Sequence, residues 1–337
     1  MKIKTVYMDI EEVLAQPVQQ HVYPKRPNIF FRMLLRAVSA PDLKATNFKY
    51  CEFEMEKLGK KEPCLVLMNH SSFIDLKIAS TVLYPRPLNI VCTSDGFVGK
   101  ERLMRSLGCI PTRKFVTDTQ LVRDMMFALK KLKSSILMYP EASYTFDGTA
   151  TPLPAGLGKC VKLMGVPVVM IRTYGAFARD PLYNGLRLRK VDVSADISYI
   201  LSPEDIRTKT AEDINGILYE LFSFDNFKWQ QENNVKISEP FRAEGLNRVL
   251  YKCPHCGAEG SMESGGADIL CNACGKGYTL TEYGFMEAKE GKTEFPHIPD
   301  WYAWERDCVR QEILKGSYKL DVPVDIYMMV NTRKVYG

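Results

Sequence analysis

The chain has 337 residues, of which 46% are hydrophobic, 11% aromatic and 25% charged, and its 45 basic against 40 acidic residues give a net charge of +5. This length accommodates one full catalytic core and a small additional module. The mild positive charge is spread along the chain, which is compatible with an anionic membrane surface but gives no basic footprint for nucleic acid. Apolar runs stay shorter than the roughly 18–20 residues that a membrane-spanning helix needs, and the N-terminal residues do not resemble a secretory signal. We therefore expect a cytoplasmic protein.

Residues 1–45 are expected to form an N-terminal arm that contains an interfacial helix. Residues 29–38 combine phenylalanine, methionine and leucine side chains with two arginines, which is typical of a helix that lies on a membrane surface. An ordinary helix with one face in the protein core explains the same composition equally well. The membrane interpretation makes this a peripheral protein on the inner face of the cell membrane.

The most informative stretch is residues 69–75, Asn-His-Ser-Ser-Phe-Ile-Asp. It follows the apolar run 64–68, which predicts a buried strand, and leads into a predicted helix. On a continuous helix a spacing of five would place Asp75 about 140° away from His70. In a turn before the helix, the carboxylate instead reaches one ring nitrogen and leaves the other free as a general base. The alternative is a purely structural pair at a helix start, with a neighbouring serine as the N-cap.

Strand and helix patterns alternate over residues 46–235. This alternation predicts an α/β fold in which helices flank a mixed sheet. The expected strands are 48–55, 64–68, 88–92, 135–139, 166–171 and 191–200, and the expected helices are 72–83, 98–107, 119–133, 156–164 and 211–224.

Four blocks in this region occur in a recognisable order. Residues 69–75 are followed by Gly-Cys-Ile-Pro-Thr-Arg-Lys at 108–114, Tyr-Pro-Glu-Ala-Ser-Tyr at 139–144 and Val-Pro-Val at 166–168. Together they resemble the boxes of the glycerolipid acyltransferase family, the family of 1-acylglycerol-3-phosphate O-acyltransferase. Its pattern is an NHxxxxD (HX4D) box, a glycine-led box ending in a basic residue, an FPEGTR box and a VPV strand.

The resemblance implies an O-acyltransferase of the phospholipid biosynthesis type, with a glycerolipid-acyltransferase-like fold. Such an enzyme moves a fatty acyl group from acyl-CoA or acyl-carrier protein to a hydroxyl of a lysophospholipid or related acceptor. His70 would be the general base, oriented by Asp75, and backbone amides at the following helix start would stabilise the oxyanion. The expected substrate-binding residues are Asn69, Lys100, Arg113, Lys114, Glu141 and Ser143.

The third box departs from the family pattern at its end. The family's Gly-Thr-Arg is replaced by Ala142, Ser143 and Tyr144. The resemblance assigns that arginine to the phosphate of the acceptor, and neither serine nor tyrosine supplies its charge or its two-pronged hydrogen bonding. The acceptor is therefore open. A second hypothesis follows, namely a catalytically lapsed acyltransferase-like protein that binds lipid or protein.

Two Cys-x-x-Cys-Gly knuckles form the second strong signal. Cys253 and Cys256 are separated by fourteen residues from Cys271 and Cys274. This spacing is typical of a zinc ribbon in which four thiolates hold a structural zinc ion. Two disulfides or a redox pair are the alternatives, which the absence of a secretory signal disfavours. Acidic residues outnumber lysines around the knuckles, so a partner or another domain is a better candidate contact than nucleic acid.

The remaining segments complete the expected organisation. The acyltransferase domain spans 46–235, a polar linker 236–248, and the zinc ribbon 249–288. Residues 289–337 are expected to contain a helix at 301–314 and a strand at 322–330, as part of a truncated further domain.

Overall fold

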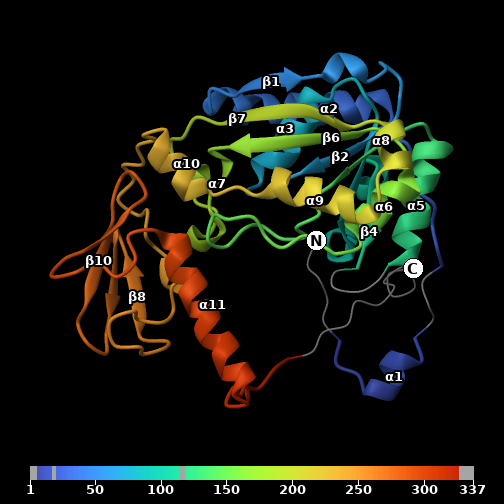
Figure 1. Ribbon diagram of the computed structural model, residues 1–337. Coiled ribbons are helices and arrows are strands. Elements are labelled where there is room, and N and C mark those ends of the chain that lie inside the picture. Colours follow the sequence, from blue (N-terminus) through green and yellow to red (C-terminus); the bar gives the residue numbers. More distant parts are fainter. Residues whose placement is uncertain (1–5, 17–19, 114–117, 326–337) are drawn as a thin grey trace.

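The computed structural model describes residues 6–16, 20–113 and 118–325 (Figure 1). A seven-stranded sheet in the order β1-β7-β6-β2-β5-β3-β4 forms its larger part. The strands are β1 (Lys49–Phe53), β2 (Leu65–Met68), β3 (Leu88–Thr93), β4 (Cys109–Thr112), β5 (Ser135–Met138), β6 (Val168–Tyr174) and β7 (Ser194–Leu201). Neighbouring strands are parallel except for β6 and β7, which are antiparallel. The sheet is therefore mixed, as predicted.

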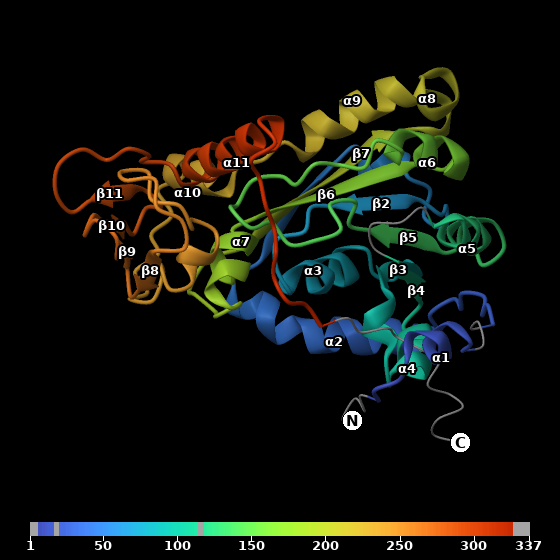
Figure 2. The ribbon, with the colours of Figure 1, turned by 90° about the horizontal axis from the view of Figure 1, so that it is seen from below.

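Helices cover both faces of this sheet (Figure 2). One face carries α2 and α3, and the other carries α5, α6, α8 and α9. In chain order the helices of this part are α1 (Ile10–Leu14), α2 (Ile29–Ala45), α3 (Ile74–Val82), α4 (Glu101–Ser106), α5 (Thr119–Lys130), α6 (Leu157–Met164), α7 (Ala176–Arg179), α8 (Pro203–Thr208), α9 (Ala211–Phe222) and α10 (Asn226–Glu232). This three-layer arrangement confirms the predicted α/β class.

Strand β2 lies in the middle of the sheet because all its side chains are apolar. Val66 and Met68 enter the core under α3, whereas Leu65 and Leu67 enter the core on the opposite face. All four are fully buried, as the two-residue period of a strand covered on both faces requires. The strand therefore gives a rigid base to the loop that follows it.

The functional loops gather at one edge of the sheet. Strands β2, β3, β4, β5 and β6 run in the same direction, so their carboxyl ends meet at one edge. Ligand sites of open α/β sheets lie at this edge. The box residues that follow β2, β4 and β5 are thereby brought to one side of the molecule.

A smaller antiparallel sheet and a long helix follow. The sheet has the order β11-β10-β9-β8, and α11 (Ile298–Leu314) packs against it with Trp301 fully buried beside Tyr278. The same apolar core includes Phe177 of α7 and Phe227 of α10, so the small sheet is joined to the large one by packing (Figure 1). Its strands are β8 (Met262–Gly265), β9 (Asp268–Cys271), β10 (Gly277–Leu280) and β11 (Met286–Ala288).

Several elements differ from the sequence-based expectations. Strand β4 was not expected because it contains Pro111, which is tolerated only because β4 lies at the sheet edge. Residues 236–248 were expected to be a polar linker, but Ile237, Ala243 and Leu246 are buried and pack into the body of the protein. The strand expected at 322–330 is absent from its described part, residues 322–325.

Candidate active site and cysteine cluster

His70 and Asp75 are in contact at the start of α3. His70 Nδ1 lies 3.1 Å from Asp75 Oδ2, and the same oxygen accepts the backbone amides of Ser71 at 2.7 Å and Ser72 at 3.0 Å. The Asp75 side chain is fully buried, whereas 21% of the His70 side chain is exposed. With Nδ1–H donated to the carboxylate, Nε2 carries the free lone pair that a general base needs.

Those hydrogen bonds change one expectation. Backbone amides at the helix start after His70 were expected as oxyanion donors, but those of Ser71 and Ser72 both point to Asp75. Two further amides, of Ile74 and Asp75, bond to the side chain and the carbonyl of Ser72. The beginning of α3 thus orients the carboxylate instead of offering these donors to a substrate.

Two tyrosines flank the imidazole. The ring of Tyr139 stacks on His70 with centroids 4.1 Å apart and an angle of 24° between the planes, and Tyr144 packs at 4.2 Å with an angle of 46°. Phe73, whose side chain is exposed, contacts Tyr144 edge to face at 5.7 Å. Burial and the Asp75 carboxylate raise the pKa of Tyr144, so its hydroxyl is neutral at physiological pH. The rings restrict the imidazole to one orientation.

Glu141 braces this loop through its two carboxylate oxygens. Oε2 accepts the backbone amide of His70, and Oε1 accepts that of Thr151, both at 2.8 Å. Burial raises the pKa of Glu141 to about 7, although the two amide donors act in the opposite direction. Glu141 was expected to contact the substrate, but these contacts support a role in positioning His70.

Asn69 also joins two chain segments. Its Oδ1 accepts the backbone amide of Thr173 at 2.9 Å and the hydroxyl of Thr173 at 3.3 Å, and its Nδ2 donates to Ser71 Oγ at 3.2 Å. The side chain is buried, so it fixes the end of β2 to β6. As with Glu141, the geometry supports positioning where substrate contact was expected.

A buried acid–base pair lies behind the start of α3. Arg179 Nη1 is 3.2 Å from Asp180 Oδ1, and both side chains are buried. Burial raises the pKa of Asp180 to about 6, while Arg179 and the hydroxyl of Ser72 lower it. This pair was not anticipated, because nothing in its local sequence distinguishes it from a surface pair.

Two of the expected basic residues, Lys100 and Arg113, lie at the same edge of the sheet. Arg113 follows β4, is largely exposed and lies 3.7 Å from Asp118. Lys100 precedes α4 and is exposed, Ser143 is half-buried in the loop after β5, and Lys114 lies outside the described residues. Arg113, Lys100 and Ser143 thus lie in segments that follow β4, β3 and β5 at this edge of the sheet.

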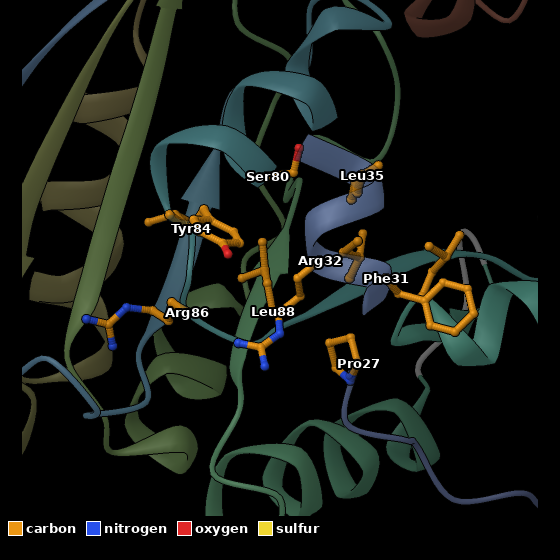
Figure 3. A pocket seen from close by; sticks show the side chains of 11 residues that line it. Pro27, Phe31, Arg32, Leu35, Ser80, Tyr84, Arg86 and Leu88 are labelled. Atoms are coloured by element: carbon orange, nitrogen blue, oxygen red, sulfur yellow. The ribbon is translucent and has the colours of Figure 1, made fainter. Parts of the chain in front are cut away.

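A pocket lies at the other end of α3 (Figure 3). Figure 3 shows it between the helix that carries Arg32 and Leu35 and the strand that carries Leu88. Its volume of about 30 Å³ holds one or two water molecules. It is too small for a fatty acyl chain, and it is separated from His70 by the length of α3.

The four knuckle cysteines converge on one point. The sulfurs of Cys253, Cys256, Cys271 and Cys274 all lie within 4.8 Å of one another, and the pairs Cys253–Cys274 and Cys256–Cys271 are each 3.8 Å apart. A tetrahedral zinc site with bonds of about 2.3 Å requires sulfur separations of about 3.8 Å, whereas a disulfide requires about 2.05 Å. The residues therefore fit zinc and not disulfides.

Helix α2 carries apolar side chains on its solvent face. Those of Ile29, Phe30, Met33, Leu34 and Val38 are 42–63% exposed. Among the described helices, none has the length and apolarity required to pass through a bilayer. The apolar side chains of the expected interfacial segment, residues 29–38, thus include several that face solvent.

Comparisons with known proteins bear on residues 51–173, which match the family model "Acyltransferase". No curated protein matches the chain. Among solved structures, the chain is similar to the 1-acyl-sn-glycerophosphate (LPA) acyltransferase PlsC from Thermotoga maritima, with 15% sequence identity and a TM-score of 0.46 over 57% of this chain and 76% of that one. The matched residues 51–173 contain His70, Asp75 and Glu141, so this part of the chain is similar to the acyltransferase family.

Proposed function

We propose that this protein transfers a fatty acyl group from acyl-CoA or acyl-carrier protein to a hydroxyl of a lysophospholipid or related acceptor. The observation that carries the proposal is the His70–Asp75 pair, 3.1 Å apart, at the carboxyl edge of the sheet in the part of the chain that is similar to the acyltransferase family. A partly exposed imidazole on a buried carboxylate is the arrangement that general-base activation of an alcohol requires.

The reaction is a single exchange of bonds at the thioester carbonyl. The acceptor oxygen attacks the carbonyl carbon while its proton passes to His70 Nε2. The tetrahedral intermediate collapses, the carbon–sulfur bond breaks, and the thiolate takes up the proton held by His70. The products are an ester and a free thiol, on CoA or on the carrier protein, and no acyl-enzyme forms.

The acceptor site is proposed to lie between the tyrosine-flanked imidazole and the basic residues at the same edge of the sheet. Lys100, Arg113, Lys114 and Ser143 remain proposed substrate contacts. The first two follow β3 and β4, whose carboxyl ends lie beside that of β5. Exposed guanidinium and ammonium groups there would hold an anionic part of the donor or the acceptor.

The membrane surface is the proposed source of the acceptor. The exposed apolar face of α2 lies in the same helical layer as α3 (Figure 2), which begins next to His70. An apolar face of this kind inserts into the headgroup region of a bilayer.

We also propose a structural zinc ion at Cys253, Cys256, Cys271 and Cys274, which would fold the small sheet without taking part in the reaction.

The test is acyl transfer by His70→Ala, measured by mass spectrometry with acyl-CoA and a panel of lysolipids. Because general-base catalysis contributes about 10²–10⁴-fold, we expect at least a 100-fold loss of turnover with the fold intact. His21→Ala is the matched control, since His21 also pairs with an aspartate, Asp124 at 2.9 Å, outside this site, and it should retain activity. Turnover by His70→Ala at the rate of the parent would refute the proposal, and lipid binding without transfer by the parent would favour a lapsed enzyme.

A further inference from the structure

The loop that contacts His70 is itself fixed by residues that are distant in the sequence. Residues 144–151, termed the active-site loop, contact His70 directly. Besides the ring of Tyr144, the Thr145 amide donates to the His70 carbonyl at 3.1 Å, and the Thr151 amide donates to Glu141 at 2.8 Å. Movement of this loop would therefore displace both His70 and the carboxylate that braces it.

Helix α10 holds the other side of the active-site loop. The backbone amide and the side-chain amide of Asn226 both donate to the carbonyl of Gly148, at 2.9 and 2.7 Å. The Ala150 amide donates to the Phe224 carbonyl at 3.1 Å. Asn226 is 5% exposed, so water does not compete readily for these bonds.

Gly148 is enclosed at this contact. Its φ of +88° is favourable for glycine, and a Cβ at this position would lie 3.0 Å from the Phe177 ring and 3.1 Å from the Phe227 ring. Both phenylalanines belong to the apolar core that contains Tyr278 and Trp301. The tip of the active-site loop therefore rests on the core of the small sheet and α11.

The small sheet and α11 in turn fix α10. Gln231 Nε2 donates to the Gly284 carbonyl at 3.0 Å, and Gln230 Nε2 donates to the Glu282 carbonyl at 3.2 Å. Asp225, the N-cap of α10, contacts His297 Nε2 at 2.7 Å, and His297 is the N-cap of α11. Helix α10 is thus bonded to the small sheet and α11 on one side and to the active-site loop on the other (Figure 1).

We propose that Asn226 is a positioning residue for the reaction. Through Asn226, the small sheet that carries the four cysteines holds the active-site loop in the conformation that places His70 and Glu141. Metal held by the four cysteines would stabilise the fold of the small sheet, so its occupancy would control the order of a loop in another part of the fold. The structural half of this proposal is independent of the reaction, and its kinetic half rests on the proposed acyl transfer.

Hydrogen exchange of the whole 337-residue chain, loaded with zinc, tests the link between Asn226 and the active-site loop. Asn226→Ala should make the amides of Thr145 and Thr151 exchange about tenfold faster, the loss that corresponds to about one hydrogen bond, while β8–β11 remain protected. Asn233→Ala is the matched control, because Asn233 ends the same helix and donates only to Trp229. Unchanged exchange of the loop in Asn226→Ala would overturn the proposal.

Removal of zinc supplies a second, independent test. Zinc is removed with a chelator, and its loss is checked by measuring the zinc content. Removal should make the backbone amides of residues 139–151 and of β8–β11 exchange faster, and addition of zinc should slow the exchange of both segments again. Faster exchange in β8–β11 with unchanged exchange in the active-site loop would refute the coupling.

The kinetic part of the proposal is tested with the same variant. Asn226→Ala should lower kcat about 10- to 100-fold with little change in the KM of the donor. If His70→Ala proves fully active, the proposed reaction fails while the exchange results still decide the coupling.

Discussion

At the residue scale, the site consists of one imidazole that is held by the Asp75 carboxylate, by the rings of Tyr139 and Tyr144, and through its backbone by Glu141. The contact expected between His70 and Asp75 from their spacing is present, because His70 precedes α3 and does not lie on it. The packing of Tyr139 and Tyr144 against His70, and the two amides on Glu141, could not be predicted from the sequence. These contacts join loops that follow different strands. Because the contacting residues are far apart in the sequence, their contact leaves no periodic pattern along the chain.

Glu141→Gln should weaken the site because a side-chain amide has only one acceptor oxygen. One of the two backbone amides, of His70 or Thr151, would lose its partner in a buried position. An unsatisfied buried donor costs about 1–3 kcal/mol, so we expect a lower melting temperature and a lower kcat. Glu62→Gln is the control, since Glu62 accepts a backbone amide in a more exposed loop; equal losses in both variants would contradict a special role for Glu141.

The pH dependence of the same variant gives a separate readout. The pKa of Glu141 is about 7 in the folded protein, above its value of about 4.3 in an unfolded chain. The folded state therefore binds more protons between these two values, and this group makes stability fall as pH rises across that window. Urea unfolding from pH 4.5 to 7.5 should show a shallower decline in Glu141→Gln than in the parent.

At the element scale, prediction succeeded where a segment has a strong period of its own. The strands β2, β3, β5 and β6 and the helices α3, α5, α6 and α9 lie near their expected positions. Helix α10 was missed because its sequence, Asn-Phe-Lys-Trp-Gln-Gln-Glu, is short and polar, and its position is fixed by the small sheet. The four cysteines were identifiable because metal ligation fixes their spacing.

The junction between α10 and α11 should weaken as pH rises. The hydrogen bond to Asp225 raises the pKa of His297 more than burial lowers it, and Asp300 and Asp147 add to the increase. A raised histidine pKa contributes stability below about pH 6.5, and this contribution is lost as pH rises through the folded-state pKa. Hydrogen bonds to charged groups contribute about 1.5–3 kcal/mol.

The measurement is the difference in unfolding free energy between the parent and His297→Ala. We expect this difference to be largest near pH 6 and to decrease towards pH 9. Titration of the cysteines affects both proteins and cancels in the comparison. A difference that is constant with pH would mean that the pair does not depend on the charge of His297.

At the scale of the whole molecule, the small sheet and α11 stand at one end of the large sheet, and the layer of α2 and α3 covers one of its faces (Figures 1 and 2). The α/β class followed from alternating patterns, but the position of the small sheet did not. Its placement results from packing of Phe177 and Phe227 into its core, and such a junction has no local signature. The sequence also left two interpretations open for the apolar residues of α2, a core-facing helix and a helix that lies on a membrane. Both have the same composition, and only the exposure of the side chains in the fold distinguishes them.

The solvent-facing apolar residues of α2 provide the last prediction. Substitution of Phe30 and Met33, which are 63% and 54% exposed, by glutamate should reduce binding to anionic phospholipid vesicles without unfolding the protein. Burial of one such side chain contributes about 1.5–3 kcal/mol, so sedimentation with vesicles should show at least a tenfold loss. Leu163→Glu is the control, because Leu163 is 57% exposed on α6, which covers the opposite face of the sheet (Figure 2). If both proteins lose binding equally, general charge repulsion explains the effect; if neither does, α2 is not the membrane contact and the acceptor must reach His70 by another face.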